Sequence, residues 1–159
     1  MTSLLRRPTA LPAPALLAVV TRLAVQPALW RPAVRFDTAS RHWERLPGPD
    51  GVDVWLLTWL PDQSTELHDH GESAAAFTVL SGAVDETRPL PPTGALRTRR
   101  LRAGATRWVP PGALHDVRGS AGGPAVSLHA YSPPLSSMTY YDDALRPVRT
   151  TSGREPEER

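Results

Sequence analysis

Residues 104–115 read GATRWVPPGALH, and this segment constrains the fold more strongly than any other part of the chain. The spacing of its key residues is G-x5-P-x-G-x2-H. Gly112 stands where a tight turn would be obstructed by a Cβ atom, and Pro110 fixes the backbone that approaches the turn. His115 then begins the next strand, where its side chain can face back into a barrel. The segment predicts a strand, a turn and a second strand that starts with a histidine.

Two further histidines lie upstream, in the H-D-H of residues 68–70. On a strand, residues i and i+2 point to the same side, so His68 and His70 can bind one metal ion while Asp69 points away. An H-x-H pair alone is common in surface strands and carries little information. In combination with the turn and His115, the pair predicts a metal site.

Short β-type runs punctuated by Gly and Pro follow one another from about Trp43 onward. We expect strands over residues 52–60, 75–80, 95–101, 106–109 and 125–131. Many short strands with Gly/Pro turns and little helix are typical of an all-β sandwich or barrel. We therefore predict an all-β domain over residues 41–148 and a polar, disordered tail over residues 149–159.

The first part of the chain differs, because its apolar residues recur at helical spacing. The periodic positions are Leu16, Leu17, Val20, Leu23 and Ala24. They predict a helical segment within residues 1–40 that packs on the β domain. A secretory signal is the alternative, since Arg6 and Arg7 precede an apolar stretch, but Pro12 and Pro14 interrupt that stretch.

The composition excludes several classes of protein. The 159 residues suit one domain plus short extensions, and the absence of cysteine excludes disulfide frameworks, zinc knuckles, iron–sulfur ligation and thiol catalysis. The formal charge is only +2, and Thr98 and Leu101 separate the arginines of residues 97–102, so we expect a solvated strand there and no nucleic-acid partner.

No apolar run approaches the roughly 20 residues of a membrane helix. We expect a cytoplasmic protein without a membrane partner, and the sequence is compatible with a monomer.

The H-x-H pair followed by G-x5-P-x-G-x2-H resembles the two motifs of the cupin superfamily. The resemblance implies a double-sheet, jelly-roll-like β-barrel that often holds one divalent metal. The usual first motif continues with a glutamate ligand, and counting back from Gly82 places that position at Ala75, which cannot ligate. We expect Glu72 in a loop and Glu86 at the surface or in a structural role. The expected metal ligands are three neutral imidazoles, which leave roughly three open positions on an octahedral ion: His68, His70 and His115.

Residues 127–134 read SLHAYSPP and are similar to the serine–histidine–tyrosine segment of the thiol dioxygenases, the cysteine dioxygenase family. In that family a ferrous ion held by three histidines binds a thiolate and oxygen, and the product is a sulfinic acid. The resemblance implies one Fe(II) per chain and a hydrogen-bonded catalytic relay formed by Ser127, His129 and Tyr131. Ala75 also stands where some members carry a cysteine crosslinked to the tyrosine, so the chain resembles the bacterial members that lack the crosslink. A cis peptide bond between Ser132 and Pro133 is also implied.

The family also places an arginine ahead of the first strand to hold the substrate carboxylate. Residues 41–46 read RHWERL, and the aromatic-x-Arg pattern puts this substrate-binding role on Arg45. Arginine suits the role because its planar fork matches a carboxylate through two parallel hydrogen bonds. Arg41 remains the alternative, and we expect His42 at the surface.

Together these features predict a non-haem Fe(II) thiol dioxygenase that adds both atoms of O₂ to the sulfur of a small carboxylate-bearing thiol. L-cysteine, converted to cysteine sulfinate, is the first substrate expected, and 3-mercaptopropionate is the alternative. Two further alternatives remain open: a cupin metalloenzyme with a non-thiol substrate, and a metal-binding sensor without turnover.

Overall fold

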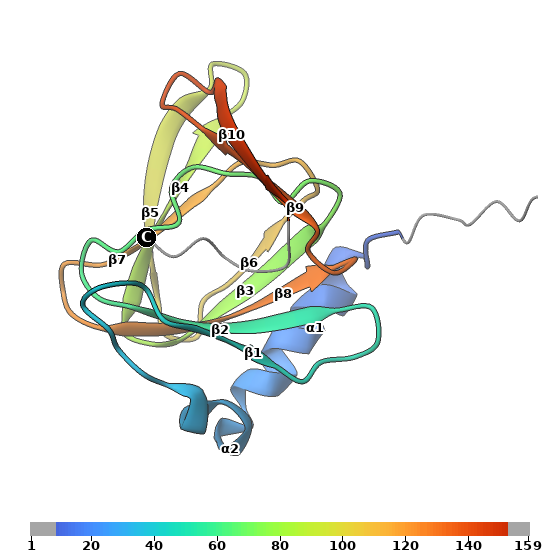
Figure 1. The fold of residues 1–159 in the computed structure, drawn as a ribbon, viewed down its shortest axis with the longest axis vertical. Coiled ribbons are helices and arrows are strands. Elements are labelled where there is room, and N and C mark those ends of the chain that lie inside the picture. Colours follow the sequence, from blue (N-terminus) through green and yellow to red (C-terminus); the bar gives the residue numbers. More distant parts are fainter. Residues whose placement is uncertain (1–8, 153–159) are drawn as a thin grey trace, which may run out of the picture.

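The computed structural model describes residues 9–152, which form short helices followed by a succession of strands. The helical part consists of α1 (Ala13–Ala24), α2 (Pro27–Trp30) and the 3₁₀ turn η1 (Arg31–Ala33). The strands are β1 (Trp43–Leu46), β2 (Asp53–Trp59), β3 (Ala74–Ser81), β4 (Ala83–Leu90), β5 (Ala95–Arg102), β6 (Thr106–Val109), β7 (Asp116–Gly119), β8 (Ala125–Ser132), β9 (Ser137–Tyr141) and β10 (Pro147–Ser152). The predicted fold class, all-β with a short N-terminal helical segment, is confirmed (Figure 1).

Two antiparallel sheets and a separate strand pair surround the interior (Figure 1). The strand order is β1-β2-β8-β3-β6 in the larger sheet and β5-β4-β7 in the smaller one, while β9 pairs with β10. One buried apolar cluster draws side chains from both sheets and from β9, as expected for the core of a double-sheet barrel. β8 is the central strand of the larger sheet, so its inward-facing side chains reach the middle of this interior.

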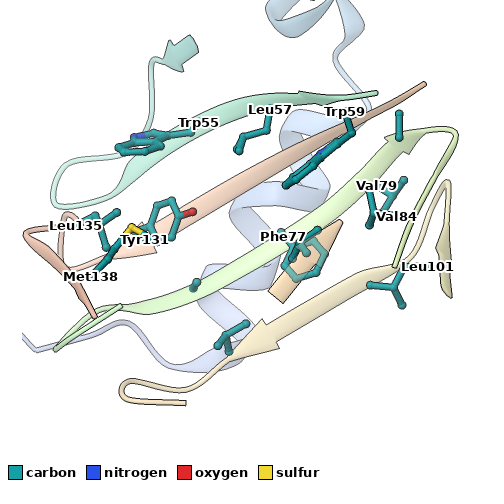
Figure 2. Packing of buried hydrophobic residues seen from close by; sticks show 14 of the residues in the cluster. Trp55, Leu57, Trp59, Phe77, Val79, Val84, Leu101, Tyr131, Leu135 and Met138 are labelled. Carbon is teal, nitrogen blue, oxygen red and sulfur yellow. The ribbon is translucent and has the colours of Figure 1, made fainter. Parts of the chain in front are cut away.

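β2 places apolar side chains on both faces because it contributes to the barrel interior and to a second apolar cluster, which also contains residues of helix α1. Trp55, Leu57 and Trp59 project from one face of β2 into the interior (Figure 2). Val54 and Leu56 face the other way and belong to a second cluster with Leu16 and Val20 of α1. Burying one such aliphatic side chain contributes about 1.5–3 kcal/mol, so α1 is part of the core and not an appendage.

The start of the helical segment is fixed by proline and by a contact to the end of β8. Pro12 is the N-cap residue of α1, and Pro14 lies in its first turn, where a missing N–H breaks no intrahelical bond. Just ahead of α1, the Leu11 N–H donates to Ser132 Oγ at 3.0 Å. Within residues 9–152 no single helix is long and apolar enough to cross a membrane. The helices Ala13–Ala24 and Pro27–Ala33, which meet at a bend of 87°, reach the required length and apolar composition only when they are taken together.

The predicted disordered tail over residues 149–159 is wrong for residues 149–152, which belong to β10. The polar composition of this segment gave no sign of a strand, because its pairing with β9 involves polar side chains. Thr150 and Thr139 join their hydroxyls at 3.0 Å, and the guanidinium of Arg149 lies 3.7 Å from the centroid of the Tyr140 ring. Such pairs stabilise an antiparallel ladder without apolar alternation. Residues 153–159 lie outside the described residues.

β5 is the edge strand of the smaller sheet, and seven of its eight residues are exposed. Its outward position confirms the solvated strand predicted for the arginine run. Arg100 pairs with Asp85 of β4 at 2.9 Å, close to solvent. The Ser132–Pro133 peptide bond at the end of β8 is cis, as the resemblance implied.

Candidate metal centre

The three predicted ligands come together inside the barrel. His68, His70 and His115 are buried, and their candidate ligand atoms all lie within 4.8 Å of one another. His68 and His70 lie in the extended segment between β2 and β3, and His115 immediately precedes β7. Backbone bonds tie the two segments together, because His68 and His115 exchange N–H···O bonds of 3.0 Å. The bridge brings histidines that are far apart in the sequence to one point.

The imidazoles are oriented so that their Nε2 atoms converge. His68 Nδ1 donates to the Glu66 carbonyl at 2.8 Å, and His68 Nε2 lies 3.0 Å from His70 Nε2. Two nitrogens that are each about 2.1 Å from one ion, at right angles, are about 3 Å apart. The pair therefore fits adjacent positions on a shared divalent ion. His70 Nδ1 is buried and has no hydrogen-bond partner within residues 9–152.

Burial keeps the first two imidazoles in the form that binds metals. It lowers the pKa of His68 well below its usual value, and the neighbouring His115 lowers it further. The pKa of His70 is lowered in the same way, first by burial and then by His68. Since only a neutral imidazole nitrogen can coordinate an ion, His68 and His70 are ready to bind a metal at neutral pH.

Glu86 was not predicted as part of this site, and the alternative that placed it at the surface is wrong. Its side chain is only 1% exposed, and its Oε1 accepts a hydrogen bond from His115 Nδ1 at 3.1 Å. Arg88 and Arg107 each donate an Nε–H to the carboxylate at 2.7 Å. Burial alone would raise the pKa of Glu86, but the bonds and charges of His115 and Arg88 outweigh it and lower the pKa to about 2. An ionised carboxylate therefore stands directly behind one metal ligand.

A second hydrogen-bonded group comes from β8. Ser127 Oγ lies 2.7 Å from His129 Nε2, and the Trp59 indole N–H donates to the same Oγ at 2.8 Å. The indole N–H occupies one of the two lone pairs of Ser127 Oγ, so the hydroxyl proton and the second lone pair remain for the contact with His129 Nε2. Burial first, and then the charges of His115 and Arg41, lower the pKa of His129 to about 3.

The expected relay does not continue to Tyr131. Within the described residues no hydrogen bond joins Tyr131 to His129, because the phenol ring leans toward His70, at 5.2 Å between centroids, and toward Trp55, at 5.5 Å. Burial raises the pKa of Tyr131, so the phenol keeps its proton. Tyr131 therefore lies beside a metal ligand as a neutral hydrogen-bond donor, and the link from Ser127 to His129 is a separate unit.

The comparison with known families agrees with this arrangement. A family model described as cysteine dioxygenase type I matches residues 9–144. The chain belongs to this family. Cysteine dioxygenase type 1 from Rattus norvegicus and from Bos taurus are each 29% identical to it over 135 residues, which is 79% of this chain and 67% of theirs.

Solved structures support the cupin fold of this cysteine dioxygenase family member. A Klebsiella pneumoniae protein with a double-stranded β-helix domain superposes with a TM-score of 0.55 and 19% identity, and the match covers 65% of this chain and 85% of that one. An oxalate oxidase gives a TM-score of 0.58 at 16% identity, over 70% of this chain and 61% of its own. At such identities the likeness concerns the fold alone.

The two arginines considered for the substrate carboxylate lie in different environments. Arg45, on β1, is exposed and lies opposite Trp55 of β2, with its guanidinium 5.7 Å from the indole centroid. Arg41 is only 4% exposed, donates to the Ser64 carbonyl at 2.7 Å and lies 5.0 Å over the Trp59 ring. Its Nε has no partner within the described part of the chain. The interior of this cysteine dioxygenase family member thus contains a buried cation, Arg41, which the sequence offered only as the alternative to Arg45 for binding the carboxylate.

The other polar residues near the site differ in how well they were predicted. Glu72 lies in the exposed loop expected for it. His42 was expected at the surface; it is half-buried there, and its Nε2 lies 3.1 Å from the Ala33 carbonyl. The partner belongs to the helical segment, which local sequence could not indicate.

The pKa of His129 predicts an acid sensitivity of the metal-free fold. Between pH 6.5 and about 3 the unfolded chain binds a proton at this residue and the folded chain does not, so folding stability falls as pH drops through this range. One such group contributes a slope of about 1.4 kcal/mol per pH unit. We expect His129→Gln to have a shallower dependence of the free energy of unfolding on pH between 6 and 4, measured by urea denaturation. An unchanged slope would contradict the neutral, buried state of His129.

Proposed function

We propose that this protein is a non-haem Fe(II) thiol dioxygenase that converts a small carboxylate-bearing thiol and O₂ into the corresponding sulfinic acid. The proposal rests on one observation above all: three buried imidazoles converge without a carboxylate ligand, in a member of the cysteine dioxygenase type I family. The reaction balances as RSH plus O₂ giving RSO₂H, with both oxygen atoms on sulfur. L-cysteine is the first substrate proposed and 3-mercaptopropionate the alternative.

We also assign the enzyme to the cytoplasm, where small thiols are kept reduced.

The donor set fits a ferrous ion, since neutral imidazoles suit divalent iron. When bound, Fe(II) supplies coordination positions for the thiolate and for O₂ and the redox chemistry that joins them. His68, His70 and His115 would hold the ion and, being neutral, would leave its positive charge available to a thiolate. The negative charge of Glu86 does not cancel this field, because Arg88 and Arg107 balance it.

Side chains next to the ion would then orient the substrate. Tyr131, held as a neutral phenol beside His70, can donate a hydrogen bond to a group bound near that ligand. Trp59 and Ser127 hold His129 through the two hydrogen-bond contacts that lead to its Nε2. Phe77 stacks on His129 with centroids 5.0 Å apart and planes 10° apart, which limits the rotation of the imidazole. These contacts support catalytic roles for Tyr131, His129 and Ser127.

We propose Arg45 as the residue that binds the substrate carboxylate, supported by its position opposite Trp55 on the inner face of the sheet. Arg45→Met should raise KM for L-cysteine by about 10- to 100-fold, the loss expected when a charge-assisted pair is removed. Cysteamine, which lacks the carboxylate, should be unaffected. The matched variant is Arg41→Met. If Arg41→Met gives the carboxylate-specific loss and Arg45→Met does not, the role belongs to Arg41.

The direct test measures turnover of the iron-loaded protein. The enzyme is purified without oxygen, loaded with Fe(II) and supplied with L-cysteine or 3-mercaptopropionate, while O₂ uptake and product mass are followed. One O₂ consumed per sulfinate formed would support the proposal, and the ratio of the two kcat/KM values would identify the substrate. Protein that holds iron but consumes no O₂ with either thiol would contradict it.

A further inference from the structure

A buried carboxylate flanked by two guanidinium groups stands behind the metal centre. Glu86 Oε1 accepts from His115 Nδ1 at 3.1 Å and from Arg88 Nε at 2.7 Å, and Glu86 Oε2 accepts from Arg107 Nε at 2.7 Å. We propose that Glu86 is a positioning residue that fixes the tautomer and ring orientation of His115 for metal binding, and that the two arginines hold Glu86 in place. The inference rests on the metal centre of the proposed function but is independent of the substrate.

The first argument concerns the proton of His115. An ionised carboxylate accepts hydrogen bonds and cannot donate them, so its contact with Nδ1 requires the proton on that nitrogen. The lone pair of His115 is then on Nε2, the atom left for a metal. Without Glu86, a buried neutral imidazole could carry its proton on Nε2 instead, and that tautomer cannot coordinate an ion through Nε2. The carboxylate therefore selects the tautomer that binds metal.

The second argument concerns orientation. Glu86 and Arg88 lie two residues apart on β4, so their side chains share one face of the smaller sheet. Arg107 comes from β6 in the larger sheet, and Arg88 also donates to the Trp108 carbonyl on β6 at 3.1 Å. The carboxylate is thus fixed between the two sheets and presents one oxygen to His115. A ring held at Nδ1 by such an anchor cannot rotate away from the position of the ion.

The three ligands differ in their outer partners, and this difference singles out His115. His68 donates to a neutral backbone carbonyl of Glu66, and His70 Nδ1 has no partner within residues 9–152. Only His115, among the three, is bonded to a charged side chain in the described structure. Carboxylates in this position typically contribute 10- to 100-fold to metal affinity. The expected contribution of Glu86 is therefore measurable in the binding of a metal alone.

The test must separate positioning from a structural role, because breaking a buried ion pair also destabilises a fold. We would measure the affinity of the metal-free protein for Co(II) by chelator competition, the Co(II) absorption spectrum, and the unfolding temperature without metal. Glu86→Gln should lower Co(II) affinity about 10-fold or more and shift the spectrum. Arg107→Met removes one guanidinium but keeps the contact between Glu86 and His115, so it should lower the unfolding temperature with a smaller loss of affinity.

Asp85→Asn provides a matched control, since Asp85 is the neighbour of Glu86 on β4 but pairs with Arg100 near the surface. It should change neither affinity nor spectrum. If the loss of affinity follows the loss of unfolding temperature equally in Glu86→Gln and Arg107→Met, Glu86 is structural and the proposal is overturned.

A measurement on the unaltered protein keeps the inference testable even if Glu86→Gln does not fold. Nitrogen-15 NMR of the imidazoles in the metal-free wild-type chain distinguishes the two neutral tautomers. His115 should carry its proton on Nδ1, and a proton on Nε2 would refute the proposal. Neither measurement depends on turnover, so a failure of the thiol dioxygenase proposal would leave this result unaffected, and the reverse also holds.

Discussion

His115→Ala is expected to abolish stable metal binding and, with it, oxygen uptake. Removal of a carboxylate behind a ligand costs about 10- to 100-fold in metal affinity, and removal of the ligand itself should cost more. Two histidines remain, and their Nε2 atoms are 3.0 Å apart, but two neutral imidazoles are a weak set for a divalent ion. The metal content of the purified protein and its O₂ uptake with L-cysteine measure the effect.

His42→Ala is the matched control for this experiment. His42 is the one histidine whose ring, bonded to the Ala33 carbonyl, belongs neither to the metal centre nor to the group on β8. Its replacement should leave the metal content unchanged. Circular dichroism of both variants shows whether the fold is kept. Stoichiometric metal in folded His115→Ala protein would refute the three-histidine assignment.

Gly82→Ala should destabilise the fold by about 3 kcal/mol or more, because two separate costs combine at this position. Gly82 lies between β3 and β4 with φ of +71°, where an L-residue with a Cβ is strained. A Cβ atom there would also collide with the Pro124 carbonyl oxygen, and it would come within 3.0 Å of the Ala125 Cα. Both obstacles are backbone atoms, one just before β8 and one in its first residue, so no side chain can move aside to relieve the contact.

Gly104→Ala separates the two costs. Gly104 has φ of +91°, yet nothing lies within 4 Å of the position of its Cβ. This variant should lose only the backbone contribution, about 1–2 kcal/mol. Urea denaturation of the metal-free proteins measures the difference. Equal losses in the two variants would show that the contact with the segment before β8 is relieved by a backbone shift.

The three histidines that the structure brings together could be picked out from the sequence because their spacing follows a local pattern. His68 and His70 are separated by one residue, and His115 follows a turn that glycine and proline specify. Strand β2 was equally visible, since a strand covered on both faces is a continuous apolar run. β4 and β10 were not predicted, because their polar residues are stabilised by neighbours across the sheet and show no apolar pattern along the chain. No single segment of the chain contains that information.

Glu86 and Arg41 show why the rest of the site could not be predicted. A glutamate just beyond a turn is usually solvated, and Glu86 is buried only because Arg107 and His115, which are distant in sequence, reach it. Only Arg45 fits the aromatic-x-Arg pattern, and the burial of Arg41, which was the alternative, depends on how the chain passes Trp59 and Ser64. Both cases depend on three-dimensional packing, and residue type alone does not reveal it.

The exposed arginines of β5 bear on how separate molecules behave in concentrated solution. An edge strand offers unpaired backbone groups to which the same strand of another molecule could add. β5 occupies such an edge and carries four arginines on mostly exposed positions, Arg97, Arg99, Arg100 and Arg102. Two copies that approach through this edge would bring like charges together within the roughly 8–10 Å over which charges interact at moderate salt. The strand thus opposes intermolecular sheet extension, and this protection against aggregation should weaken as ionic strength rises.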